Sequence, residues 1–194
     1  MIKFEKVIRK FGDIDALCDI SFEIEHGEFV FVTGPSGAGK TTIIKLLLRE
    51  YLPTSGKIWV DNEDLDKIKT KNIPSYRQKI GVVFQDFKLL TDRTIFENVA
   101  LPLEFGKMPK KAIEKYVNEV VELVDLTERI NLFPAQLAGG EIQRACLARA
   151  IVANPKILIA DEPTGNLDPS TSWQIIKLIK KINKLGKEKL PVYP

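Results

Sequence analysis

Residues 34–42 read GPSGAGKTT and directly follow the apolar run EFVFVT at 28–33. Gly34, Gly39, Lys40 and Thr41 fill the pattern G-x-x-x-x-G-K-[ST], in which backbone amides cradle phosphate oxygens. In that pattern the lysine places a positive charge at the outer phosphates, and the threonine hydroxyl suits Mg²⁺. The stretch therefore predicts a nucleotide phosphate site. Its predicted binding residues are Gly34, Pro35, Ser36, Gly37, Ala38, Gly39, Lys40, Thr41 and Thr42.

Two carboxylates follow the apolar run KILIA later in the chain. Asp161 is expected to reach a magnesium ion directly or through water, and Glu162 to orient or deprotonate an attacking water. Such a pair is a weak signal by itself. Together with a phosphate loop it predicts phosphoryl transfer to water.

A second glycine-rich start of a helix lies in LAGGEIQRACLARA at 137–150. Gly139 and Gly140 would open this helix, whose first amides have no acceptors within the helix. The stretch predicts a second anion site, separate in sequence from the first.

The alternation of apolar and polar residues indicates which elements position these groups. We expect strands at 2–11, 16–25, 28–33, 56–61, 80–84 and 156–161, and helices at 40–51, 110–124, 139–153 and 170–186. The strand at 156–161 reads as buried and parallel, and His26 as a turn residue. The helix at 110–124 should bury one face made of Ile113, Tyr116, Val117, Val120, Val121 and Val124.

This order predicts an α/β fold in a single domain over 1–194. Its core would comprise 1–93, including an antiparallel β part, and 137–194, with a helical subdomain from about 94 to 136.

Composition limits which classes of protein this chain can belong to. No apolar run approaches the roughly 18 residues of a membrane span, and the first residues lack a signal-peptide core, so we expect a soluble cytoplasmic chain. Cys18 and Cys146 match no metal spacing and read as buried or inert thiols. Residues 177–189 hold six lysines and one glutamate. A solvated helix face is the preferred interpretation, with anionic lipid as the alternative; nucleic acid is disfavoured because no aromatic residues interleave.

The stretch at 137–150 resembles the signature motif of ATP-binding cassette (ABC) ATPases, usually LSGGQ or LSGGE. The resemblance implies the P-loop nucleotide-binding fold of that family, with ATP and Mg²⁺ as cofactors. It also implies a head-to-tail homodimer, in which the signature of one subunit closes on ATP held by the other. The residues given this role are Ala138, Gly139, Gly140 and Glu141.

Further positions match the same family. The resemblance implies that Gln85 contacts magnesium and senses a transporter-like partner, and that Phe11 stacks on adenine, although a core aromatic is the alternative for Phe11. The implied catalytic residues are Glu162 and Gln85, and the implied metal set is Thr41, Gln85 and Asp161. The implied dimer-interface loop is Asn166, Leu167 and Asp168.

Residues 73–81, 84–103 and 160–168 are similar to the FtsE family of cell-division ATPases. That resemblance implies an FtsX-like integral membrane protein as partner, a peripheral position at the cytoplasmic face of the membrane, and ATP-driven activation of cell-wall hydrolases. Residues 160–168 are shared with lipoprotein-releasing and macrolide-export ATPases, which remain alternatives. A nucleotide-binding module with little turnover is another. DNA-repair and chromosome-organising relatives are disfavoured, because their long coiled-coil insertions are missing.

Two departures from the family pattern affect the expected activity. Ala138 stands where the family has serine, and losing a hydrogen bond to the γ-phosphate, worth about 1.5–3 kcal/mol, should weaken dimer closure. The chain reads GKEKLPVYP where the family continues with a strand and a switch histidine, so we expect a C-terminally truncated fold with impaired turnover. The only histidine, His26, precedes the run at 28–33 and cannot substitute.

Overall fold

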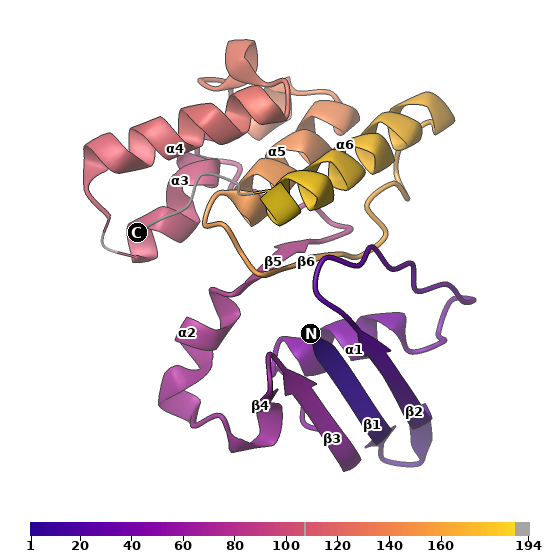
Figure 1. Ribbon diagram of the computed structural model, residues 1–194. Helices are drawn as coiled ribbons and strands as arrows, with labels where there is room; N and C mark the ends of the chain where they lie inside the picture. Colours follow the sequence, from indigo (N-terminus) through magenta and orange to yellow (C-terminus); the bar gives the residue numbers. More distant parts are fainter. Residues whose placement is uncertain (107, 189–194) are drawn as a thin grey trace. The chain divides into compact units, whose positions relative to one another are not determined.

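The computed structural model describes residues 1–106 and 108–188, which fold into two units, Met1–Arg77 and a second that begins at Gln78. The first unit contains a four-stranded antiparallel sheet with the strand order β2-β1-β3-β4 (Figure 1). The strands are β1 (Ile2–Phe11), β2 (Ile14–Ile24), β3 (Ser55–Val60) and β4 (Glu63–Asp64). The antiparallel β part expected from the sequence is confirmed.

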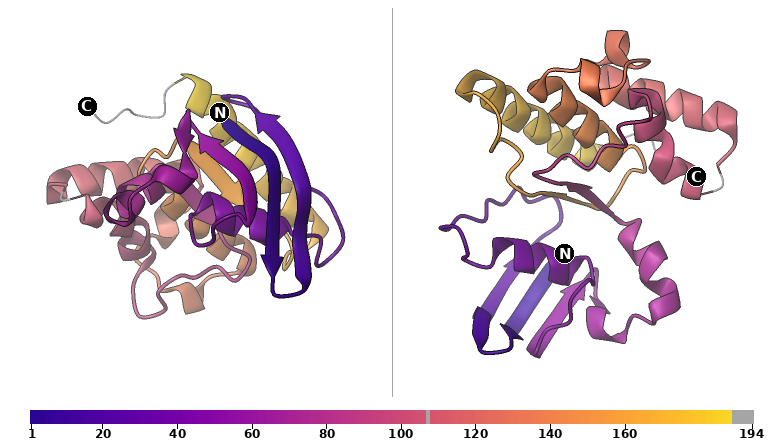
Figure 2. Two further views of the ribbon diagram at one scale, coloured as in Figure 1. Left: turned by 90° about the horizontal axis from the view of Figure 1, so that it is seen from below. Right: turned by 180° about the vertical axis from the view of Figure 1, so that it is seen from behind.

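Helix α1 (Lys40–Leu47) lies against one face of this sheet (Figure 2). Its last turn buries Leu46 and Leu47, and the Tyr76 hydroxyl donates to the Leu47 carbonyl at 2.6 Å. The helix is shorter than the predicted 40–51, because the chain turns after Leu48 and Arg49 has a φ of 56°. A short helix, α2 (Ile73–Arg77), ends the unit.

The strand predicted at 28–33 is wrong for this structure, because residues 28–35 have no regular secondary structure. The apolar side chains of Val30, Phe31 and Val32 are exposed. A β-strand is stabilised by hydrogen bonds to a neighbouring strand. The sheet of the first unit contains no strand that pairs with this segment. The expected strand-loop-helix context is therefore present only in its loop and helix.

The second unit is built on two parallel strands, β5 (Ile80–Val83) and β6 (Ile157–Ala160), paired from Ile80 with Ile157 to Val83 with Ala160. The parallel direction predicted for 156–161 is confirmed, although β6 is half-buried rather than fully buried. Gly81 lets β5 approach α5 closely, because a Cβ at this position would meet the Ala150 carbonyl oxygen.

Four helices complete the second unit: α3 (Ile95–Phe105), α4 (Lys110–Leu123), α5 (Gly139–Ile151) and α6 (Pro169–Glu188). Helix α5 is central, because it touches α3, α4, α6 and β5 (Figure 1). Thr94 and Glu97 form a capping box that starts α3. Short 3₁₀ helices occur at Leu65–Lys67 and Thr70–Asn72 in the first unit, and at Thr127–Arg129 and Pro134–Gln136 in the second.

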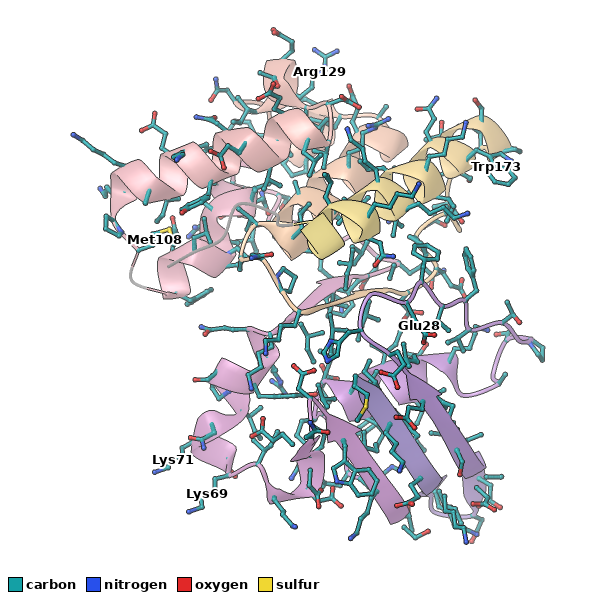
Figure 3. The ribbon with its side chains drawn as sticks, in the orientation of Figure 1. Glu28, Lys69, Lys71, Met108, Arg129 and Trp173 are labelled. Atoms are coloured by element: carbon teal, nitrogen blue, oxygen red, sulfur yellow. The ribbon has the colours of Figure 1, made fainter. Side chains whose placement is uncertain are left out.

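Helices α4 and α6 are both amphipathic, and the buried face predicted for α4 is confirmed. In α4 the predicted face is buried, with Tyr116 only half-buried at its margin. In α6 the described lysines are exposed and Trp173 stands out from the first turns of the helix (Figure 3). The last two lysines of the 177–189 stretch lie outside the described side chains. No helix within the described ranges has the length and apolar character needed to cross a membrane.

Candidate functional site

The phosphate loop is folded around its lysine. The Lys40 ammonium donates to the carbonyl oxygens of Gly34 and Pro35, each at 2.9 Å, and the Ala38 amide donates to Pro35 at 3.2 Å. Gly37 and Gly39 have φ values of 80° and 86°, which glycine adopts without strain. The ammonium therefore lies across the loop that would surround a phosphate group.

The start of α1 suits an anion. Gly39 caps the helix without any side-chain hydrogen bond, and its first turn contains no acidic residue. The first amides of a helix have no acceptors within the helix and carry its positive dipole end. A phosphate chain bound here would meet these amides, Lys40 and the hydroxyl groups of Thr41 and Thr42. The residues present suit the phosphates of a nucleotide.

Gly39 also joins the phosphate loop to the β1–β2 hairpin. A Cβ on Gly39 would lie 2.5 Å from the Ala16 carbonyl oxygen and 2.7 Å from a methyl of Leu17. Leu17 pairs with Arg9 across the hairpin. Phe11, two residues after Arg9, is the last residue of β1. This packing places Leu17, the strand partner of Arg9, against the phosphate loop at Gly39.

Phe11 is 37% exposed, which favours a role at a surface over a place in the core. The Arg9 guanidinium lies 4.4 Å from the centroid of its ring, and the Tyr51 ring meets it edge-on at 5.1 Å. A partly exposed aromatic ring beside a phosphate loop is suited to stacking on a nucleotide base.

In the second unit, the predicted carboxylates follow β6 directly. The Asp161 amide donates to the Val83 carbonyl at 2.9 Å, which extends the β5–β6 ladder by one residue. Glu162 then adopts a φ of 46°, a conformation that is strained for a residue with a side chain. The Gly165 amide donates to the Glu162 carbonyl at 3.0 Å and closes a turn.

The side chains of Glu162 and Gln85 converge at Gly165. A Cβ on Gly165 would lie 3.6 Å from Glu162 Oε2 and 3.7 Å from Gln85 Nε2. The structure thus brings together the two side chains predicted to be catalytic, at the carboxyl ends of the two parallel strands. A carboxylate and an amide at one point can together hold a water molecule.

The segment after Gln85 is fixed by α5. Arg149 donates to the carbonyl oxygens of Lys88 at 2.5 Å and Phe87 at 2.8 Å, and the Cys146 thiol donates to Phe87 at 3.3 Å. Burial lowers the pKa of Arg149 and raises that of Cys146 to about 12, so the thiol stays protonated. The role of Arg149 was not predicted from the sequence. The one hint in the sequence is that an arginine stands in an otherwise apolar turn of the helix.

The second predicted anion site is the start of α5, where Gly139 and Gly140 pack closely against the chain that leads into α6. A Cβ on Gly139 would lie 3.4 Å from Leu167, and one on Gly140 would lie 2.6 Å from the Thr171 methyl. Because larger residues would clash with Thr171, glycine at 140 has a structural role within the subunit as well.

Glu141 is engaged within its own subunit. Its carboxylate accepts from the Ala138 amide at 2.9 Å and from Arg129 Nε at 3.0 Å (Figure 3 labels Arg129). The Ala138 amide and then Arg129 lower the pKa of Glu141. Arg129 is a second residue that sequence reasoning missed, since it lies twelve positions before its partner.

Asp168 begins α6. Its carboxylate accepts from the Thr171 amide at 3.0 Å, and hydrogen bonds from the Thr171 hydroxyl and amide lower its pKa. Asp followed by Pro169 is a common start of a helix, so the sequence contained this signal. In the loop before it, Asn166 is exposed and Leu167 is half-buried.

The predicted residues divide between the two units. Phe11 and the phosphate loop, with Thr41, belong to the first; Gln85, Asp161, Glu162 and the start of α5 belong to the second. The described residues contain no cluster of three or more His, Cys, Asp or Glu side chains able to hold a metal ion. Mg²⁺ commonly takes one or two protein ligands and completes its shell with phosphates and water.

Two other expectations concern the histidine and the chain end. His26 lies in a turn, as predicted, 3.4 Å from Asp61 Oδ1 and in contact with the Met1 amino group. The missing strand and switch histidine concern positions after residue 188, outside the described residues.

Comparison with known proteins identifies the class. Residues 17–165 match the model of the ABC transporter family. The chain therefore belongs to the ABC transporter family, as an ABC ATPase of mixed α/β fold with an antiparallel sheet.

Individual relatives indicate which type of ABC ATPase this chain is. The chain is 53% identical to the cell division ATP-binding protein FtsE of Bacillus subtilis over 96% of its own length and 82% of that protein. It is 48% identical to the methionine import ATP-binding protein MetN of Carboxydothermus hydrogenoformans, over 89% of its length and 52% of that protein. A dimeric structure of the ATP-binding cassette MJ0796 with ADP and Pi matches with a TM-score of 0.84, at 38% identity, over 95% of this chain and 83% of that one. The chain is thus an ABC ATPase of the FtsE type.

Proposed function

We propose that this chain is the ATP-hydrolysing subunit of an FtsE–FtsX-type complex that acts in cell division. ATP binding, closure of a dimer and hydrolysis would drive movement in an FtsX-like integral membrane protein, which activates cell-wall hydrolases. The FtsE relative supports this assignment. The chain would be held at the cytoplasmic face of the membrane by that partner.

The observation that carries the proposal is the convergence of Glu162 and Gln85 at Gly165. Glu162 would accept a proton from the attacking water, and Gln85 would orient that water and contact the magnesium ion. Asp161, fixed by its amide to β5, would complete the magnesium contacts with Thr41. Mg²⁺ neutralises charge that develops on the phosphate oxygens.

Nucleotide binding would use the first unit. Lys40 would exchange the carbonyl oxygens of Gly34 and Pro35 for phosphate oxygens, which are stronger acceptors because they are charged. Phe11 would stack on the adenine ring, since its ring is partly exposed beside the phosphate loop.

A head-to-tail homodimer is supported by the dimeric structural neighbour. In it, the Gly139 and Gly140 amides of each subunit would meet the γ-phosphate held by the other, and the Asn166–Asp168 loop would cross the interface. Ala138 offers no hydroxyl, and its amide already donates to Glu141, so closure relies on the glycine amides.

Two further functions are alternatives. A transporter ATPase is favoured by the identity to a methionine import protein, and it includes the lipoprotein-releasing and macrolide-export types. A nucleotide-binding module with little turnover is favoured by the alanine at 138.

Hydrolysis assays separate motor from module. Wild-type protein should hydrolyse Mg·ATP, Glu162→Gln should bind ATP but lose turnover, and Lys40→Ala should lose binding. Equal low turnover in wild type and Glu162→Gln would support the module. Co-purification with the product of an adjacent membrane-protein gene identifies the partner and separates a division complex from a transporter.

A further inference from the structure

Arg9 occupies an unusual position in the cluster around the predicted base-stacking ring. It lies on β1 two residues before Phe11 and pairs with Leu17, which contacts the phosphate loop at Gly39. Arg9 therefore belongs to the part of the hairpin that would face a bound nucleotide, although the phosphate-loop pattern does not include it.

The guanidinium of Arg9 touches two aromatic rings at once. Its central carbon lies 4.4 Å from the Phe11 centroid and 5.2 Å from the Tyr51 centroid. The two rings meet edge-on at an interplanar angle of 71°. Lys45 adds a second cation 5.4 Å from the Tyr51 centroid. Cations over aromatic faces are attracted to the negative charge of the ring.

Hydrogen bonding holds Arg9 in this position only partly. One terminal nitrogen donates to the Leu52 carbonyl at 3.0 Å. Its Nε is buried and has no hydrogen-bond partner among the described residues. A buried N–H without an acceptor is unfavourable, so the guanidinium is placed by its contact with the rings rather than by a full set of hydrogen bonds.

This arrangement has a consequence for Phe11. The ring is 37% exposed at the end of a hairpin, where an unsupported side chain would occupy several rotamers. Arg9 covers one of its faces and Tyr51 contacts it edge-on, so one orientation is favoured before a base arrives. A group that is already ordered loses less entropy when it binds.

We infer that Arg9 is a positioning residue that pre-orders Phe11 for stacking on the purine base, with Tyr51 as the second support. Arg9 acts through Phe11. It determines how much affinity the base adds to that provided by the phosphates. The inference rests on the proposed ATP binding.

The test separates the contribution of the base from that of the phosphates. Calorimetry with Mg²⁺ gives the Kd for ATP and for inorganic tripolyphosphate, and the ratio of the two measures what the adenosine part, with its base, contributes to affinity. Arg9→Met keeps the apolar stem and removes the guanidinium. The matched control is Lys3→Met on the same strand, which removes a cation 5.7 Å from the Trp59 centroid.

Arg9→Met should weaken ATP binding about three- to tenfold and leave tripolyphosphate binding unchanged. Arg9→Lys should restore part of the loss, because a cation remains over the ring. In a Phe11→Ala background, Arg9→Met should have no further effect on the ratio. Lys3→Met should change neither Kd.

Several results would overturn the inference. An equal loss for both ligands would show a general structural role, and an unchanged ATP affinity would show that Phe11 needs no support. Tighter ATP binding would show that the guanidinium blocks the face used by the base. If wild-type protein binds neither ligand, the proposed function fails and the inference with it; if wild type binds both equally, only the base-stacking inference fails. If Arg9→Met does not fold, the Kd values for ATP and tripolyphosphate are measured with Arg9→Lys instead.

Discussion

Replacing Arg149 by methionine should loosen the loop that follows Gln85. The substitution keeps the apolar stem and removes the group that donates to the Lys88 and Phe87 carbonyl oxygens at 2.5 and 2.8 Å. Hydrogen bonds from a charged donor contribute about 1.5–3 kcal/mol each. Phe87 is half-buried and Lys88 is exposed, so water can replace part of this contact. We therefore expect a net loss of about 2–3 kcal/mol, below the sum of two such bonds.

Hydrogen exchange provides the local assay. The Phe87 amide donates to Phe84 at 3.2 Å and the Lys88 amide to Asp86 at 2.6 Å, and both bonds lie in the tethered loop. A loss of 2–3 kcal/mol corresponds to roughly 30- to 150-fold faster exchange of these amides where local opening controls it. Arg149→Lys, which can reach one carbonyl at a time, should give an intermediate rate.

The same variant should affect catalysis more than binding. Gln85 directly precedes the tethered residues, so kcat for ATP should fall at least tenfold, by less than the roughly 10²–10³ that a direct transition-state contact contributes. The Kd for ATP should change little, because the phosphate loop lies elsewhere in the chain. Arg93→Met is the control, since its ion pair with Glu104 is long at 4.0 Å and exposed. Wild-type exchange rates in Arg149→Met would refute the tether, and an equal loss of binding and turnover would refute its link to Gln85.

Single side chains elsewhere in the second unit also have measurable roles. Asn98→Ala should destabilise the protein by about 2–4 kcal/mol in urea titrations, since the buried amide bonds the Leu90 amide and three carbonyl oxygens. Asp168 has a lowered pKa, so its stabilisation is present above its ordinary value and lost as the pH falls through the lowered one. Asp168→Asn should therefore be less stable than wild type at neutral pH, with a difference that shrinks below about pH 4. Charge reversal at exposed Asp86 or Lys88 should impair co-purification with the membrane partner without changing ATP binding; unchanged recovery of the partner would contradict this surface as the docking site.

Local patterns predicted most of the helices well. The α4 face was predicted from its spacing, since a helix buries residues three and four positions apart whatever it packs against. The predicted start of α5 at Gly139 is also confirmed, and its end lies two residues before the expected one. The parallel direction of β6 was predictable because the strand follows a helix and is apolar throughout.

The segment at 28–33 shows the limit of such patterns. Its apolar residues favour a strand, but a strand also needs partners, and pairing is a property of the fold rather than of the segment. The backbone turns of the phosphate loop could be predicted because its glycines stand in adjacent positions of the sequence. The contacts of Arg149 and Arg129 could not, because their partners lie 61 and 12 positions away along the chain.

Helix α5 links the two functions assigned to the second unit. Its first residues form the predicted second anion site, and its last turn fixes the loop after Gln85 through Arg149. Its start also packs on Leu167 and Thr171, at the entry to α6. A helix of thirteen residues behaves as a rigid rod about 20 Å long, so a shift at its start is transmitted to its end. A phosphate bound at Gly139 and Gly140 would therefore bias the position of Gln85, and with it the water shared with Glu162. If the start of α5 binds phosphate as proposed, binding there and hydrolysis would be coupled through this helix. Arg149→Met would weaken that coupling by loosening the loop after Gln85.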